Sequence, residues 1–337
     1  MRIIRIIIDG LWSCFGMIFA IGELLIDFIA VEDVDLKYVK TFEKHPGGAP
    51  ANMVVGLRRL GVPSALISKV GRDVFGEFLI EELECEGVDT RYISHDEENP
   101  TGVVFVQLRE AKPNFLLFEK TAYFNLRMED VNLEFMDSAE LLHFGGVLLA
   151  REPSRTTCLE VVRMARERGI PISFDVNIRL HLWKGRIGEL VECVRRALEL
   201  ADVVKLGDGE KRFLEENGVN LGDLDLKLIA ITMGEKGSTL IHGGREITTP
   251  PYPVKAVDST GAGDAYMAAL LAALYSMGKL GDLSLNDEEL RLVGRFANVV
   301  AAISTTKRGA WSVPTLSQLE EIGEIKPIVD GLRRRGG

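Results

Sequence analysis

An α/β fold with a mostly parallel central sheet is predicted by two features of the 337-residue sequence. From about residue 129 to the C-terminus, short apolar runs alternate with helical stretches. Repeated strand–helix units of this length imply parallel strands joined by right-handed crossovers. The runs are apolar throughout, as strands covered by helices on both faces must be. The four runs are 141–146, 170–177, 201–207 and 228–234.

The N-terminal region starts like a secretory signal, with basic residues ahead of a very apolar stretch. However, Asp9 and then Glu23 interrupt the stretch, so no 18 uninterrupted apolar residues are available to cross a membrane. We therefore expect residues 17–27 to form a first buried strand and residues 1–16 to be an N-terminal extension. No membrane association is expected, and the predicted location is cytoplasmic.

Two segments, 28–46 and 99–124, break the strand–helix alternation. The first is polar and strand-prone, and the second reads as a hairpin with a short loop around Lys112, Pro113 and Asn114. Neither has a helical partner, so we expect a small β-layer that covers the strand ends as a lid and excludes water. Decorative hairpins or a dimer contact are the alternatives.

The helices between the strands have recognisable ends. Ser154 can cap a helix that stops before Gly169, and Gly218 follows another. The composition of the whole chain is ordinary for a folded protein, and the length allows one large domain or two.

The charge and the metal-binding residue types exclude some function classes. Asp and Glu outnumber Lys and Arg by 50 to 40, for a net charge of −10, so a nucleic-acid partner is not expected. The four cysteines form no CxxC pair and the five histidines no HxxxH or HExxH, so we expect no structural transition metal.

The segment 256–274 carries the strongest chemical signal. Gly261, Ala262 and Gly263 are small enough for backbone N–H groups to converge, and an almost wholly apolar helix follows them. A buried helix that starts with free N–H groups suits the charge on a transferring phosphoryl group. A carboxylate there, Asp264, would repel phosphate, but it is sensible as the base for the attacking hydroxyl. The alternative is that Asp264 only caps the helix.

A second glycine cluster occurs at 46–61. Gly47 and Gly48 allow close backbone approach, and a helix is expected from about Pro50 to Leu60. Asn52 in its first turn can donate and accept hydrogen bonds, as a polyol requires, although an Asn at a helix start is more often structural.

These two stretches resemble the two signatures of the ribokinase-like (PfkB) carbohydrate kinases. DSTGAGD at 258–264 is similar to D-T-x-G-A-G-D, with Ser259 in place of the usual Thr, and GGAPAN at 47–52 is similar to G-G-x-x-x-N. The resemblance implies a three-layer sandwich over 17–330, formed as one kinase domain with a discontinuous lid. It also implies ATP, Mg²⁺ and a monovalent cation such as K⁺ as ligands.

The resemblance implies roles for the residues of both signatures. Asp264 would be the catalytic base, and Gly261, Ala262 and Gly263 the anion hole. The implied sugar contacts are Asp27, Gly47, Gly48 and Asn52. Asp258 would lie beside a monovalent-cation site made of backbone carbonyls. Without the resemblance, Asp27 would read as a solvated strand end.

Further matches concern the substrate anion and the nucleotide. FDVNIR at 174–179 resembles the D-x-N-x-R stretch of fructokinases and 2-keto-3-deoxygluconate kinases, in which Arg179 would bind phosphate or a substrate carboxylate. An exposed Arg179 held by Asp175 is the alternative. Glu210 matches the acid of the N-x-x-E element that helps to organise Mg²⁺ through water, but Gly207 replaces the Asn. The implied nucleotide contacts are Thr232, Gly234, Gly237 and Asn298, with 307–312 completing the pocket.

The motifs of competing enzyme classes are absent. The sequence has no G-x-x-x-x-G-K-[ST], no G-x-G-x-x-G after the first strand and no G-x-S-x-G, which weighs against P-loop kinases, dinucleotide oxidoreductases and serine hydrolases. A non-catalytic sensor predicts a damaged Asp264, which is intact.

We therefore predict a fructokinase-like sugar kinase that acts on a small sugar and ATP. The alternatives within the class are a 2-keto-3-deoxygluconate kinase and a nucleoside or ribose kinase. Homodimerisation through the lid is also expected. Candidate specificity residues in the lid are Phe105, Gln107 and Lys120.

Overall fold

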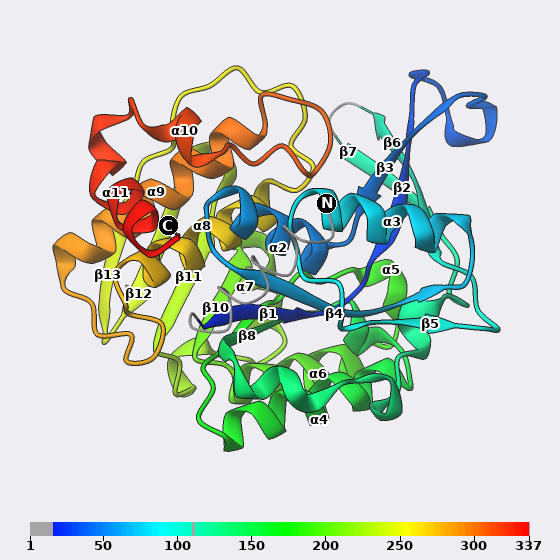
Figure 1. The fold of residues 1–337 in the computed structure, drawn as a ribbon, viewed down its shortest axis with the longest axis horizontal. Helices are drawn as coiled ribbons and strands as arrows, with labels where there is room; N and C mark the ends of the chain where they lie inside the picture. Colours follow the sequence, from blue (N-terminus) through cyan, green and yellow to red (C-terminus); the bar gives the residue numbers. More distant parts are fainter. Residues whose placement is uncertain (1–15, 110–111, 337) are drawn as a thin grey trace, which may run out of the picture.

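The computed structural model describes residues 16–109 and 112–336, and nearly all of the N-terminal extension predicted at 1–16 lies outside this range. The described residues form a large sheet between two layers of helices, with a smaller sheet at one end (Figure 1). The α/β class predicted from the sequence is confirmed.

The large sheet has nine strands in the order β13-β12-β11-β10-β9-β8-β1-β4-β5. All adjacent pairs are parallel except those made by β12, which is antiparallel to both neighbours. The strands are β1 (Met17–Ile21), β4 (Ser64–Gly71), β5 (Ile93–Asp96), β8 (Ala139–Gly145), β9 (Ile172–Asp175), β10 (Val203–Gly207), β11 (Leu228–Thr232), β12 (Ser238–His242) and β13 (Arg245–Thr249).

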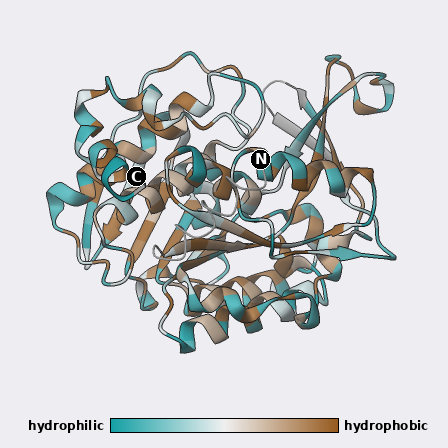
Figure 2. Ribbon diagram, in the orientation of Figure 1, coloured by the Kyte–Doolittle hydropathy of each residue, from teal (hydrophilic) through white to brown (hydrophobic). Residues whose placement is uncertain are grey.

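The central strands are mostly apolar because helices cover both faces of the sheet, and Figure 2 shows them as mainly hydrophobic. Along β1, Ile18 and Ala20 belong to one buried cluster, and Phe19 and Ile21 belong to the other. Successive side chains of a strand point to opposite faces, so one short run feeds both cores.

Two helix layers supply the opposing cores. One layer contains α2 (Ala49–Arg59), α3 (Val74–Cys85), α8 (Ala262–Ser276), α9 (Asp287–Ser304) and α11 (Lys326–Gly336), with the short α10 (Leu316–Leu319) beside it. The other contains α4 (Ser154–Glu167), α6 (Ile187–Leu200) and α7 (Asp208–Glu216), with the short α5 (Leu180–Trp183). Helix α8 is buried on nearly all sides from Ala265 to Tyr275, as its apolar sequence predicts.

The smaller sheet has the strand order β3-β2-β6-β7. It consists of β2 (Leu25–Ala30), β3 (Phe42–Gly47), β6 (Gly102–Arg109) and β7 (Lys112–Leu117). The two segments that lacked helical partners therefore do leave the main sheet. Lys112, Pro113 and Asn114 pair with β6 as part of β7 and are not a loop, so the predicted turn position was wrong.

Two local predictions are corrected. The segment 17–27 is not one strand: β1 ends at Ile21, and β2 begins at Leu25 in the other sheet. Ser154 does not cap α4 by accepting a backbone N–H. Its hydroxyl instead donates to the carbonyls of Leu148 and Arg151, at 2.9 and 3.0 Å. In the ranges described, no helix has the length and apolar character that crossing a bilayer requires.

Candidate active site

A cavity of about 460 Å³ lies where the central parallel strands end. Its wall includes residues that follow β1, β9, β10 and β11, the first turns of α2 and α8, and one face of the small sheet. Open parallel sheets bind their ligands at this edge, because the carboxyl ends of the strands and the helix N-termini meet there.

The first turn of α8 forms one side of the cavity. Gly261 is the N-cap with φ 75°, and a Cβ there would lie 2.7 Å from the Cβ of Ala310. The N–H of Ala262 donates to the carbonyl of Ser259 at 3.2 Å. The N–H groups of the next two residues have no acceptor within the helix, and both residues line the cavity. This turn can therefore hold an anion.

Asp264 lies in that turn, and its carboxylate does not cap the helix. The carboxylate accepts a hydrogen bond from Asn52 Nδ2 at 2.7 Å. The Oδ1 of Asn52 in turn accepts a hydrogen bond from Trp311 Nε1 at 2.9 Å. Burial raises the pKa of Asp264 to about 6, with Lys205 lowering it and Asp175 raising it. Asn52 thus joins the two glycine-rich signatures, 212 residues apart, across one cavity.

The glycines of the first signature make room for the side chain of one acidic residue and the backbone of another. A Cβ on Gly47 would lie 2.2 Å from Oδ2 of Asp27, and one on Gly48, at φ 107°, would lie 2.3 Å from the carbonyl oxygen of Glu23. Burial, with Asp264 adding to it, raises the pKa of Asp27 to about 7. Asp27, Gly48 and Asn52 line the cavity.

Glu23 was missed in the sequence analysis. Its Oε1 accepts from the N–H of Ala49 at 3.0 Å, its Oε2 has no partner among the described residues, and it lines the cavity. Burial raises the pKa of Glu23 to about 7. A charged residue directly after an apolar strand was the available signal.

The alternative in which Asp175 holds Arg179 is wrong. Asp175 accepts from Lys205 Nζ at 2.9 and 2.7 Å, and the exposed Arg179 lies on the cavity wall. Glu210 also lines the cavity. Its two oxygens accept from the N–H groups of Ile178 and Gly207, at 2.6 and 2.7 Å, and burial raises its pKa.

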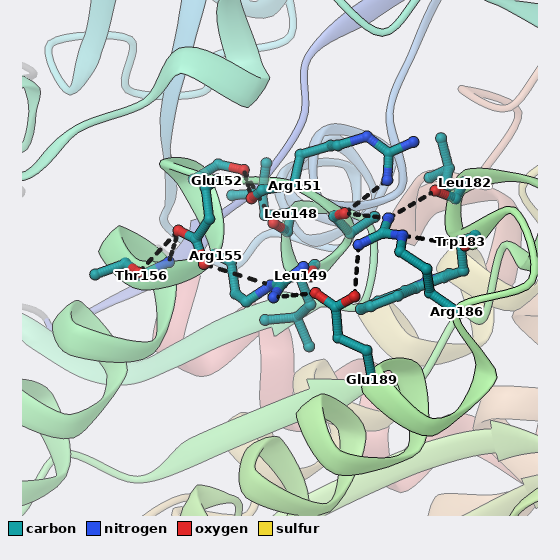
Figure 3. Close-up of polar contacts among 12 residues, drawn as sticks. Leu148, Leu149, Arg151, Glu152, Arg155, Thr156, Leu182, Trp183, Arg186 and Glu189 are labelled. Atoms are coloured by element: carbon teal, nitrogen blue, oxygen red, sulfur yellow. Dashed lines mark hydrogen bonds and ion pairs between the residues drawn. The ribbon is translucent and has the colours of Figure 1, made fainter.

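A polar network fixes the segment that follows Arg179 (Figure 3). Glu189 of α6 accepts from Arg155 of α4 at 2.6 Å and from Arg186 at 2.8 Å. Arg186 also donates to the carbonyl of Leu182 in α5 at 3.2 Å, and Leu182 lines the cavity. Helix α5 is therefore tied to two longer helices.

The residues predicted to contact the nucleotide do not all line this cavity. Thr232 lines the cavity, whereas Gly234 begins the short 3-10 helix Gly234–Lys236 and Gly237 ends it, both outside this lining. The amide of Asn298 donates to the carbonyls of Thr249 and Pro250, at 3.2 and 3.0 Å, and it also lies outside the lining. These donors join α9 to the end of β13.

Asp258 lines a separate pocket of about 200 Å³ beside the small sheet. Its carboxylate accepts from the N–H groups of Thr260 and Gly309, at 2.9 and 3.0 Å. Asp258 thus connects the segment that leads into α8 with the segment 307–312.

The small sheet turns a different face to the cavity than expected. Val104 and Val106 line it, together with Leu117. Phe105 stacks on Phe28 on the opposite face, with ring centroids 5.2 Å apart. Because side chains alternate along a strand, Phe105 and Gln107 are not the residues that line this wall. Lys120 is not among them either.

Comparisons with known proteins agree on one family. A model described as pfkB family carbohydrate kinase matches residues 16–316. An uncharacterized sugar kinase of Pyrococcus horikoshii is 50% identical over 316 residues, covering 94% of this chain and 98% of that protein. Its crystal structure in complex with ATP matches with a TM-score of 0.85 and 49% identity, over 92% of this chain and 99% of that one.

Two fructokinases are also similar. Fructokinase-2 of Solanum lycopersicum is 36% identical over 319 residues, which cover 91% of this chain and 95% of that protein. A fructokinase double mutant of Vibrio cholerae O395, with fructose, ADP and a potassium ion bound, matches with a TM-score of 0.79 and 30% identity. That match covers 90% of this chain and 97% of that one.

Proposed function

Since the chain belongs to the pfkB family of carbohydrate kinases, we propose that it transfers the γ-phosphoryl group of ATP to a primary hydroxyl of a small sugar, with fructose as the expected acceptor. The observation that carries this proposal is the buried carboxylate of Asp264 in the first turn of α8, beside free helix amides and facing the same cavity as Asp27. Fructose is favoured by the similarity to two fructokinases.

The proposed reaction uses groups at both ends of the cavity. Asp264 takes the proton of the attacking hydroxyl, the hydroxyl oxygen bonds to the γ-phosphorus, and the bond from that phosphorus to the bridging oxygen breaks to release ADP. The amides at the start of α8 stabilise the charge on the transferring group. Asp27 and Asn52 hold the sugar hydroxyls.

Magnesium would be held through water. The part of the chain that the structure describes contains no cluster of three or more acidic, His or Cys side chains able to bind a metal ion directly. Mg²⁺ keeps several waters and binds substrate phosphates, and Glu210, with both oxygens already accepting backbone N–H bonds, suits an outer-sphere role. Bound Mg²⁺ would neutralise phosphate charge during transfer.

Asp258 would shape a monovalent-cation site rather than bind the ion itself, because its carboxylate is committed to Thr260 and Gly309. Backbone carbonyls of the two connected segments would then be the ligands. Thr232, Gly234, Gly237 and Asn298 remain proposed nucleotide contacts. A homodimer through the small sheet is also proposed.

The direct test is a panel of sugars with ATP and Mg²⁺, with and without K⁺, read by ADP release. We expect fructose to give the highest kcat/KM. A 2-keto-3-deoxygluconate kinase is the second candidate, because Arg179 and His181 lie on the cavity wall and could bind a carboxylate. Glu23 and Asp27 would repel that carboxylate when ionised. Failure of every sugar to release ADP would overturn the proposed function.

The Asp27→Ala variant should raise KM for the sugar by about 10- to 100-fold, the loss expected for hydrogen bonds to a charged group. The KM for ATP and the kcat at saturating sugar should change little. The control is Asp137→Ala, which removes an exposed carboxylate that is not part of the cavity lining. An unchanged sugar KM would exclude Asp27 as a sugar ligand.

The kcat/KM for the sugar should fall as pH drops below about 6, because Asp264 has a pKa of about 6 in the protein without ligands and acts only when deprotonated. The expected plot of log kcat/KM against pH rises through the acid range and levels off once Asp27 and Asp264, with pKa values of about 7 and 6, are both ionised. Steady-state rates at subsaturating sugar between pH 5 and 9 check this, with circular dichroism confirming that the protein stays folded. A flat profile down to pH 5 would contradict the assignment.

A further inference from the structure

Lys205 is a buried cation on the central strand β10. Its side chain is about 8% exposed, and the neighbouring residues of the strand are apolar. Lysine is almost never buried unless it is paired. Here Nζ donates to both oxygens of Asp175 on β9, at 2.9 and 2.7 Å.

The ammonium group of Lys205 lies at the first turn of α8. A Cβ built on Gly263 would be 2.9 Å from Lys205 Nζ, so a glycine at this position leaves space for the ammonium. Lys205 lines the cavity, whereas Asp175 does not. Since an ammonium has three donors and Asp175 accepts two, the third is available on the cavity side.

The charges around Lys205 keep it protonated. Burial lowers its pKa, but Asp175, Asp264 and Glu210 together raise it above the ordinary value. The fixed positive charge of Lys205 and the free amides at the start of α8 both favour an anion at this point over a neutral sugar hydroxyl.

We propose that Lys205 contacts the transferring phosphoryl group and that Asp175 is the positioning residue that holds the ammonium there. The inference rests on the proposed function. Lys205 forms no covalent bond: the hydroxyl proton goes to Asp264, the phosphorus–oxygen bond to ADP breaks, and Lys205 balances the negative charge on the three peripheral oxygens.

The competing explanation is that Lys205 only neutralises Asp175 in the core. Lys69 on β4 serves as the comparison, because it is equally buried and pairs with Asp130 at 2.8 Å, but it does not line the cavity. The two explanations differ in what happens when both members of the pair are made neutral.

The test uses Lys205→Met, Asp175→Asn and the double variant, with Lys69→Met as the control. Lys205→Met should lower kcat by about 10²- to 10³-fold, as removal of one charge-stabilising donor does elsewhere. Calorimetry should show ATP binding weakened at least about 10-fold and ADP binding almost unchanged, because ADP lacks the γ-phosphoryl group. Lys69→Met should reduce Tm and leave kcat unchanged.

The double variant decides between the explanations, because it leaves no unpaired buried charge and removes the cause of misfolding. We expect it to be folded and as slow as Lys205→Met, since Asp175 acts only through Lys205. Recovery of near-normal kcat and ATP affinity in the double variant would overturn the proposal. If the unmodified protein bound ATP without phosphorylating any sugar, the proposed function would fail. The comparison of ATP and ADP binding to Lys205→Met would then still test whether Lys205 contacts the γ-phosphoryl group.

Discussion

Replacement of Asp264 by Asn is expected to lower kcat by about 10²- to 10⁴-fold, the usual contribution of a general base. An Asn side chain keeps an oxygen that can accept the hydrogen bond from Asn52 Nδ2, which spans 2.7 Å here, but it cannot take a proton from the sugar hydroxyl. ATP binding should be largely retained, since the amides at the start of α8 are unchanged. Steady-state kinetics together with ATP titration by calorimetry measure both quantities.

The folded state should tolerate this substitution. The pKa of Asp264 is about 6 in the folded protein against an ordinary 3.8. The contribution of the protonated side chain to the free energy of unfolding is therefore complete below about pH 3.8 and is lost as pH rises through about 6. At pH 7.5 the ionised carboxylate therefore disfavours folding, and Asp264→Asn should not lower Tm.

The matched control is Asp287→Asn, which changes an exposed acid in the first turn of α9. It removes the same interaction with a helix dipole, and its kcat should equal that of the unmodified protein. Near-normal turnover by Asp264→Asn would remove the basis for the proposed mechanism.

The Gly261→Ala variant is the second substitution with a large expected effect, a loss of kcat of about 10²- to 10³-fold. Gly261 has φ 75°, and a Cβ there would approach the Cβ, Cα and carbonyl oxygen of Ala310 at 2.7 to 3.0 Å. Because two of these three atoms are backbone atoms, the turn itself must move, and the amides of α8 lose their alignment with the transferring group. Kinetics with saturating ATP and sugar would measure this loss.

Gly278 provides a control at the other end of the same helix. It has φ 68°, and a Cβ there would meet only the flexible guanidinium of Arg335, at 2.8 Å. Both substitutions should cost about 1–2 kcal/mol in unfolding free energy, from the left-handed backbone alone. Only Gly261→Ala should lose turnover. Equal kcat values for the two variants would mean that the shape of the GAG turn does not matter for catalysis.

Two features of the sequence predicted more than local structure. The apolar runs at 141–146 and 201–207 predicted strands covered on both faces because burial requires it. The two glycine-rich signatures predicted one site, and the structure places Asn52 and Asp264 in direct hydrogen-bond contact. The strands were readable from local composition, and the shared site was readable because the two signatures together resemble those of one kinase family.

Other parts depended on how distant segments meet. The packing of the small sheet decides which face of β6 lines the cavity. Val104 and Val106 lie on that face, while Phe105 stacks on Phe28 on the opposite face. The break in 17–27 was also missed. Gly22 and Glu23 interrupt the apolar run there, but only the tertiary packing decides that the chain passes from one sheet into the other at this point.

The sequence by itself determined the α/β class and the buried helix α8 that begins at a glycine-rich turn, because periodicity, helix starts and glycine clusters act over a few neighbouring positions. Only the tertiary structure decided that Lys205 pairs with Asp175 instead of leaving that acid to Arg179, and that Glu23 is buried beside Ala49. Charges buried in a core must find partners through space, and those partners are 30 and 26 residues away along the chain.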